Sequence, residues 1–133
     1  MPVFHAHLPK GRFSRDQKIA IGNALNQSLV QALNIPPGDR VVILSEHADD
    51  ELFIDPTFMG MNRTPNAMII QVLIGAHRPL SDKKALMAKI AELLQQAADI
   101  SPDDVFIAIV PVPIENFSFG RGLAQLADAA PKW

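Results

Sequence analysis

The sequence predicts an α/β (α+β) fold, in which a tandem beta-alpha-beta repeat forms a four-stranded sheet with two helices on one face. Two observations predict it. A serine precedes an amphipathic helical pattern at Ser14 and again at Ser81, 67 residues later. Each helical pattern lies between two strand-like apolar runs, and a turn containing Pro and Asp follows each helix. Because one helix joins the two strands of each half, we expect those strands to pair in parallel.

The first strand and the first helix follow from alternation and spacing. Residues 2–8 form a strand-like run in which His5 and His7 lie on the face opposite the apolar residues. Ser14 and Gln17 form a capping box for a helix over about residues 15–33. Apolar residues then recur at the spacing of a one-sided helix, at Ile21, Ala24, Leu25, Leu29 and Leu33.

A turn, a second strand and a linker complete the first half. The turn at residues 35–40 leads into an apolar run at residues 41–44, which predicts the second strand. The linker that follows, about residues 48–65, is rich in Asp, Gly, Pro, Met and Asn. We expect a small hairpin in it, around Phe53 and Ile54.

The second half repeats this order. Its first strand is expected over residues 67–74 and its helix over about residues 82–98, with Ser81 as the cap. The turn at residues 100–104 leads into the last strand, at residues 105–110. The apolar positions of this helix are Leu86, Ile90, Leu93, Leu94 and Ala97.

The composition fits one soluble domain made of two fused halves, about residues 1–60 and 66–133. Of the 133 residues, 48% are hydrophobic and 20% charged. The absence of Cys excludes disulfides and thiol catalysis and is consistent with a cytoplasmic protein. No secretory signal precedes the first strand, and the apolar run at residues 67–76 is too short to span a membrane. With a net charge of −2 and no basic cluster, neither nucleic acid nor a membrane is an expected partner.

Two helices on one face leave the other face of the sheet without cover. Short additional segments and a neighbouring subunit are the simplest sources of that cover. We therefore expect the protein to form an oligomer.

Pro2 is the most informative candidate for chemistry. If Met1 is removed, the chain begins with a secondary amine that can act as a base, an acid or a nucleophile. An apolar or cationic environment lowers the pKa of such an amine, whereas a carboxylate raises it. Many proteins begin with Met-Pro without using the proline, so this residue alone does not establish catalysis.

Two charged residues are further candidates, each with a structural alternative. Arg78 follows the third strand and could hold a substrate carboxylate with two parallel donors, or be a solvated loop arginine. Asp39 could touch the chemistry or only stabilise its turn, as Asp104 is expected to do in the second half. His5 and His7 have no evident third ligand for a metal, and surface or interface positions are favoured for them.

These features, in their order along the chain, resemble the tautomerase superfamily. The resemblance rests on Pro2, the Asp39-Arg40 turn, Glu46-His47, His77-Arg78-Pro79 and the tail at residues 116–122, Asn-Phe-Ser-Phe-Gly-Arg-Gly. That tail is similar to the Trp-Ser-Phe-Gly-Arg-Gly segment of the malonate semialdehyde decarboxylase group. The resemblance implies a tautomerase/MIF-like fold, a homotrimer, and an active site around Pro2 that needs no cofactor.

The resemblance also implies roles for single residues. Pro2 falls on the catalytic proline, Asp39 on an aspartate that positions water, and Arg78 on a substrate-binding arginine. The family's second arginine is absent, because this chain has Leu80 at that place. The tail contributes Phe119 and Arg121 as candidates for substrate binding, and Arg121 is a candidate replacement for the missing arginine.

The implied function is decarboxylation of a small oxo acid, similar to malonate semialdehyde decarboxylase, with phenylpyruvate-type tautomerase activity alongside. Three alternatives stay open. The protein could be a pure keto–enol tautomerase, a hydratase or dehalogenase of 3-substituted acrylates, or a non-catalytic binding protein similar to relatives of macrophage migration inhibitory factor.

Overall fold

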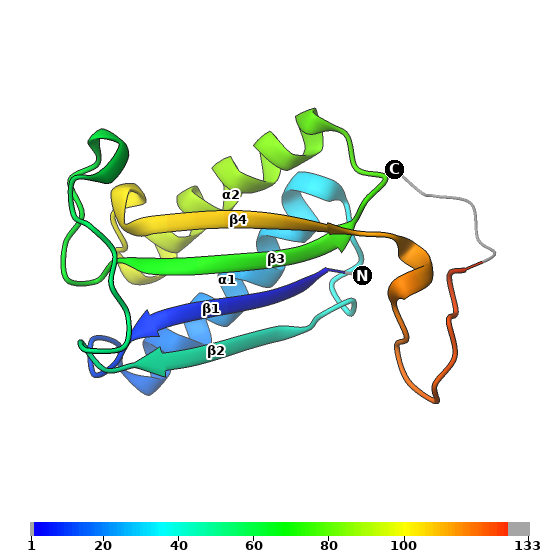
Figure 1. The fold of residues 1–133 in the computed structure, drawn as a ribbon, viewed down its shortest axis with the longest axis horizontal. Helices are drawn as coiled ribbons and strands as arrows, with labels where there is room; N and C mark the ends of the chain where they lie inside the picture. Colours follow the sequence, from blue (N-terminus) through cyan, green and yellow to red (C-terminus); the bar gives the residue numbers. More distant parts are fainter. Residues whose placement is uncertain (1, 128–133) are drawn as a thin grey trace.

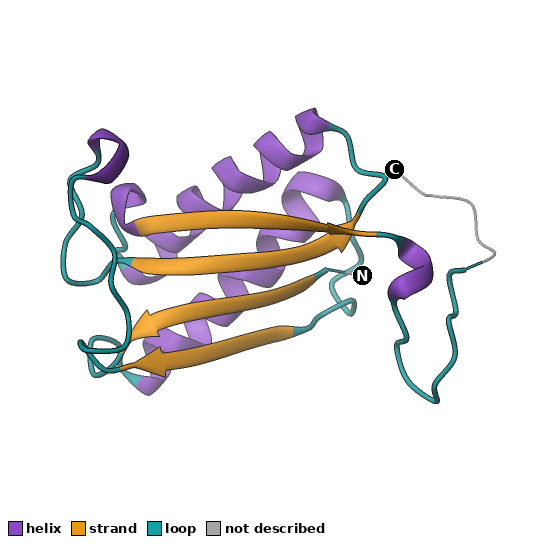
Figure 2. Cartoon of the chain, viewed as in Figure 1, coloured by secondary structure: helices purple, strands orange, loops and turns teal. Residues whose placement is uncertain are grey.

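The structure, a computed structural model, describes residues 2–127 and contains one four-stranded sheet with two long helices against one of its faces (Figures 1 and 2). Three short 3₁₀ helices lie in the connections, at Phe58–Gly60, Pro102–Asp104 and Ile114–Asn116. The main elements, in chain order, are β1 (Val3–Pro9), α1 (Arg15–Leu33), β2 (Val42–His47), β3 (Met68–Gly75), α2 (Leu80–Ala98) and β4 (Val105–Val112).

The strands lie in the order β2-β1-β3-β4. As predicted, the two strands of each half pair in parallel, β1 with β2 and β3 with β4. The halves meet through an antiparallel pair, β1 with β3. The starts of β1 and β2 therefore lie at the same end of the sheet as the ends of β3 and β4. We call this end of the strands the candidate edge, because it carries the candidate site.

The first helix has the predicted bounds, and its capping box is confirmed. The Ser14 side chain accepts a hydrogen bond from the Gln17 N–H at 3.1 Å, and the Gln17 side chain accepts one from the Ser14 N–H at 2.8 Å. These two bonds satisfy donors that the first turn of a helix otherwise leaves unpaired.

The second helix begins two residues earlier than predicted. Its N-cap is Pro79, and Ser81 lies within the helix instead of capping it. The ring of proline fixes φ, here −73°, and the Pro79 carbonyl already accepts the N–H of Asp82 at 3.1 Å. The two helices are consequently offset by 65 residues, from Arg15 to Leu80, and not by the predicted 67.

The core lies between the helices and the face of the sheet that carries Phe4, Ala6 and Leu8, all three fully buried. Every predicted apolar position of α1 is buried. In α2, Ala97 is exposed, contrary to expectation, whereas three of its leucine and isoleucine side chains are buried, those of Leu86, Ile90 and Leu94.

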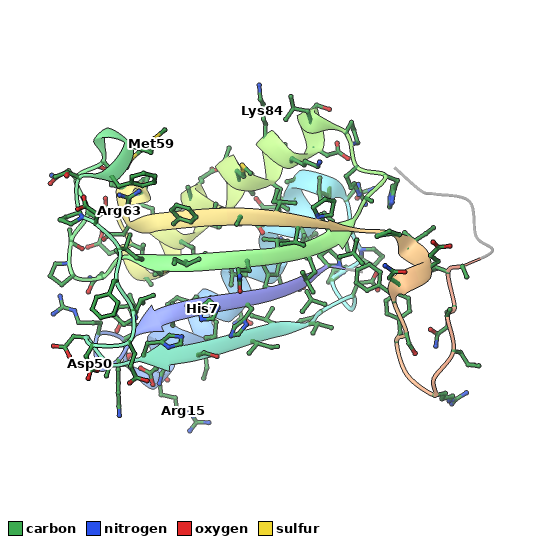
Figure 3. The ribbon with its side chains drawn as sticks, in the orientation of Figure 1. His7, Arg15, Asp50, Met59, Arg63 and Lys84 are labelled. Carbon is green, nitrogen blue, oxygen red and sulfur yellow. The ribbon has the colours of Figure 1, made fainter. Side chains whose placement is uncertain are left out.

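The expected hairpin around Phe53 and Ile54 is wrong, because no residue between β2 and β3 forms a strand. The chain turns instead at Asp55, whose side chain accepts from the N–H of Thr57 at 2.8 Å and from its hydroxyl at 3.0 Å. These bonds, the backbone one first, lower the pKa of Asp55. Arg63 adds hydrogen bonds to two carbonyls of the same segment, which lies at the far left in Figure 3.

The second face of the sheet carries no helix (Figure 2). Large apolar side chains on this open face stay exposed in the single chain, among them Ile43, Leu73, Phe106 and Val110. No helix within residues 2–127 is long and apolar enough to cross a membrane.

Candidate active site

Pro2 lies at the candidate edge, where β1 and β2 begin and β3 and β4 end. Val3 pairs with Leu73, which places Pro2 beside the end of β3. The N–H of Phe4 donates to the carbonyl of Val41 at 3.0 Å, which places the start of β2 on the other side of β1. Pro2 itself is buried.

Asp39 reaches the same edge through the turn before β2. Its N–H donates to the Pro36 carbonyl at 3.0 Å, and its side chain is exposed. The turn is also held from α1, because the buried side-chain amide of Asn26 donates to the Pro37 carbonyl at 3.1 Å. Sequence reasoning missed Asn26, although a polar residue between Leu25 and Leu29 on the buried side of a helix was a signal.

The matching turn of the second half has a structural role. Asp104 is 2% exposed and accepts from the Thr64 N–H at 2.7 Å and the Thr64 hydroxyl at 2.6 Å. This confirms the expectation that Asp104 is structural. Asp39, which lies 65 residues earlier, keeps its side chain at the surface of the candidate edge.

Arg78 lies just beyond β3 at this edge. Its N–H donates to the Gly75 carbonyl at 3.3 Å, and its side chain forms an ion pair with Asp82, Nη1 to Oδ2, at 3.2 Å. The Arg78 side chain is only 10% exposed. A guanidinium has five N–H donors, so the bond to Asp82 leaves others for a ligand carboxylate. At the place of the second arginine, Leu80 begins α2 with 64% of its surface exposed.

The tail that follows β4 leaves this edge and extends away from the strands (Figure 1). Phe119 and Arg121 are both exposed on it. Arg121 adopts a left-handed φ of 60° between two glycines that also have positive φ. The side chain of Gln125 holds the loop closed, with bonds to the N–H of Phe119 and the carbonyl of Gly120, each 3.0 Å long.

A hollow of about 230 Å³ lies between the end of β3 and the beginning of the tail. Its lining includes one imidazole, His77, and one carboxylate, Glu115. Sequence reasoning did not name Glu115. Another hollow of about 220 Å³ lies at the opposite edge, where Pro9 ends β1. Among residues 2–127, no three His, Cys, Asp or Glu side chains are grouped to hold a metal ion.

The structure thus brings Pro2, Asp39 and Arg78 to one sheet edge, from three separate segments of the chain. It places Phe119 and Arg121 on the tail that starts from that edge but extends away from it. A buried proline, a carboxylate and a guanidinium together can transfer a proton and bind an anion.

Comparison with known proteins shows the family of the chain. Two family models, both described as tautomerase enzyme, match residues 39–120 and residues 2–62. A probable tautomerase of Bacillus subtilis (strain 168), YusQ, is 29% identical over 128 residues, which are 96% of this chain and 100% of the relative. Another from the same strain, YrdN, is 32% identical over 125 residues, covering 94% of this chain and 95% of the relative.

Solved structures with a similar fold include two malonate semialdehyde decarboxylases. The FG41 malonate semialdehyde decarboxylase inhibited by 3-bromopropiolate is 34% identical, with a TM-score of 0.88 and coverage of 97% of this chain and 99% of that one. A malonate semialdehyde decarboxylase studied for its decarboxylase and hydratase activities is 28% identical, with a TM-score of 0.85 and coverage of 92% and 94%. The fused 4-OT symmetric trimer shares the fold, with 20% identity, a TM-score of 0.79 and coverage of 96% and 99%.

Proposed function

The chain belongs to the tautomerase superfamily of enzymes, and on that premise we propose that it uses Pro2, as the amino terminus, to decarboxylate a small oxo acid. The observation that carries this proposal is that the segments of Pro2, Asp39 and Arg78 all lie at the candidate edge. The chain is similar over nearly its whole length to two malonate semialdehyde decarboxylases, at 34% and 28% identity, and this similarity supports the choice of reaction.

In the decarboxylase reaction, Pro2 carries a proton and donates a hydrogen bond to the carbonyl oxygen of a 3-oxo acid. Arg78 holds the substrate carboxylate. The bond between that carboxylate and the neighbouring carbon breaks, carbon dioxide leaves, and the electron pair passes into an enolate whose oxygen Pro2 stabilises. The enolate then takes up a proton at carbon. Asp39 positions water at the edge of the site.

The charge state of Pro2 depends on two opposing influences at this edge. Burial favours the neutral amine, because it removes water from the charged form. A carboxylate close to the amine favours the charged form. Asp39 is the residue we assign to the second influence, and a charged Pro2 is what the decarboxylase reaction requires.

Keto–enol tautomerisation is the second candidate, and one observation favours it. Leu80 stands where the decarboxylase pattern has its second arginine, so the site has one cation fewer to hold a carboxylate. In that reaction a neutral Pro2 takes the proton from the enol oxygen of an acid such as the enol form of phenylpyruvate and delivers it to the neighbouring carbon, which gives the keto form. The family models and both curated relatives carry the tautomerase name.

We assign the active form to a homotrimer in the cytoplasm that works without a cofactor. The exposed apolar side chains of the open sheet face support assembly through that face. The tail extends away from its own strands, so we place Phe119 and Arg121 against a neighbouring subunit. The solved trimer of the same fold supports this number of subunits.

A titration of the Pro2 amine tests the proposal. Protein whose Met1 is removed, as verified by mass spectrometry, is labelled with nitrogen-15 proline and followed by NMR. A pKa above about 8 supports the decarboxylase reaction, and a pKa below neutrality makes Pro2 a base and supports tautomerisation. Pro2→Ala should lower the turnover of malonate semialdehyde or of phenylpyruvate by about 100-fold or more. Full activity of this variant on every substrate turned over would overturn the proposal.

A further inference from the structure

Three of the four histidines of the chain form one continuous cluster on the open face of the sheet. His7 Nδ1 lies 2.8 Å from His47 Nε2, which joins β1 to β2. His7 Nε2 lies 3.0 Å from Oε1 of Gln71 on β3. His5 Nε2 lies 2.7 Å from the Ser45 hydroxyl. His7, labelled in Figure 3, lies on the sheet face turned away from the helices.

The hydrogen bonds constrain where the protons of His7 and His47 can lie. The Gln71 oxygen can only accept, so neutral His7 carries its proton on Nε2 and accepts at Nδ1. His47 must then donate from Nε2. A proton added to His7 can be accommodated only if His47 moves its own proton to Nδ1. A second proton would place two N–H groups against each other across 2.8 Å and break the bond.

The rings also lie too close together to carry several charges. The centroids of His5 and His7 are 4.0 Å apart, and those of His7 and His47 are 5.0 Å apart. Burial, followed by the charges of the other two histidines, lowers the pKa of His5 below its ordinary value of 6.5. Each proton taken up therefore makes the next one less favourable.

No carboxylate on the open face compensates for such charge within the described strands. Glu46 points to the other face, where Lys18 binds it at 3.0 Å. The charged groups that flank the cluster lie beyond the strand ends: Lys10 follows β1, and Asp49 lines the hollow that His47 also lines. The other neighbours on this face are uncharged, namely Val3, Ile43, Ser45, Ile69, Gln71 and Leu73.

We propose that the cluster of His5, His7 and His47 makes assembly of the protein acid-labile, so that its protonation releases the open sheet faces from one another. The inference rests on the proposed trimer. In that trimer the apolar side chains around the cluster become buried, and burial disfavours a charged imidazole further. The separated chain exposes the cluster to water and accepts protons more easily, so falling pH favours separation.

Sedimentation velocity between pH 8 and pH 5, at constant ionic strength and protein concentration, tests this inference. The trimer is expected to be intact above about pH 6.5, the ordinary histidine pKa. Below it, the dissociation constant should rise on the order of a thousandfold per pH unit if each subunit takes up one proton. Circular dichroism at each pH reports whether the separated chain stays folded.

Two variants identify the cause. The double variant His7→Gln with His47→Gln keeps polar groups on the face but leaves only His5 able to become charged. It should stay assembled about one pH unit further into acid. The matched control, His77→Gln, removes the histidine at the candidate active edge and should dissociate at the wild-type pH. Nitrogen-15 NMR of the histidine rings at pH 8 should show His7 with its proton on Nε2.

Other results would overturn the inference. It is wrong if the wild-type trimer persists at pH 5, or if the double variant dissociates at the same pH as the wild type. A chain that is already monomeric at pH 8 would refute both the proposed trimer and this inference. Decarboxylase and tautomerase assays at pH 8 judge the proposed reaction separately, because they do not depend on assembly at acid pH.

Discussion

Asn26 in α1 holds the turn that carries Asp39, through a 3.1 Å hydrogen bond from its buried side-chain amide to the main-chain carbonyl of Pro37. This bond connects a helix of the core with the candidate active edge. The position of Asp39 therefore depends on a residue eleven places before Pro37 in the chain.

Asn26→Ala should lower turnover more than its effect on stability explains. The loss of one neutral hydrogen bond costs about 1 kcal/mol of unfolding free energy. Because the Asp39 turn loses its support, we also expect kcat to fall about tenfold while KM changes little, as for a group displaced by part of an ångström. Ser28→Ala is the matched control, since the buried Ser28 hydroxyl bonds to Leu25 within its own helix at 2.6 Å. Equal kcat values for the two variants would show that the turn does not position Asp39 for the reaction.

Arg78→Lys should weaken substrate binding without unfolding the protein. Lysine keeps the positive charge, and can keep an ion pair with Asp82, but loses the planar fork that binds a carboxylate through two parallel bonds. We expect KM to rise about tenfold and the denaturation midpoint in urea to change little. Lys89→Met is the control, because Lys89 forms a partly exposed ion pair with Glu92 at 2.8 Å on α2, the helix that contains Asp82. An unchanged KM in Arg78→Lys would remove Arg78 from the substrate site.

Thr64→Val should destabilise the fold through Asp104. The valine keeps the N–H that binds the buried carboxylate but removes the hydroxyl that lies 2.6 Å from it. A buried acceptor left with one donor fewer costs about 1–3 kcal/mol, measured by urea unfolding at pH 7. Thr57→Val is the control, because Thr57 binds the exposed Asp55 in the same way. Equal losses in the two variants would contradict a structural role for the burial of Asp104.

The ion pair between Lys18 and Glu46 should give the fold a pH dependence in acid. The hydrogen bond from Lys18, followed by that from the Gly11 N–H, holds the pKa of Glu46 below its ordinary 4.5. A carboxyl group with a lowered pKa stabilises the folded state above its unfolded pKa, and this contribution disappears as the pH falls through the folded pKa.

Glu46→Gln should therefore be less stable than wild type at pH 7 and equal to it near pH 3. High salt should shrink the difference at pH 7, because both side chains are about one-third exposed. Glu51→Gln, in the turn after β2, is the control for loss of one carboxylate. A difference that is unchanged from pH 7 to pH 3 would show that the charge of Glu46 contributes nothing.

The sequence was sufficient for the elements whose boundaries depend on local interactions. The capping box at Ser14 fixes the start of α1, and the residue spacing of that helix identifies its buried side. The predicted start of α2 was wrong because Ser81 and Asp82 resemble a helix cap in the sequence. The fixed φ of Pro79 allows the helix to begin two residues earlier. The prediction of a hairpin was wrong because the side chain of Asp55 accepts hydrogen bonds from the N–H and the hydroxyl of Thr57, which forms a turn there instead.

The candidate site shows the same division. Pro2, Asp39 and Arg78 stay predictions, made from the position of Pro2 behind Met1 and from the family resemblance, and the strand order places all three at the candidate edge. The ion pair between Arg78 and Asp82 was missed, although its spacing of four residues was visible. The contact of His7 with His47 needs the register of β1 against β2, which depends on packing that no local pattern specifies.

The antiparallel pairing of β1 with β3 places the starts of the two halves at opposite edges of the sheet. Pro2 begins the first half, whereas Met68 begins β3 in the middle of the chain, where its nitrogen is held in an amide bond and cannot titrate. At most one strand start per chain can therefore become a free amine. At the opposite edge, where β3 and β4 begin, Thr64 instead binds Asp104 and holds the linker to the sheet, so that edge has a structural role.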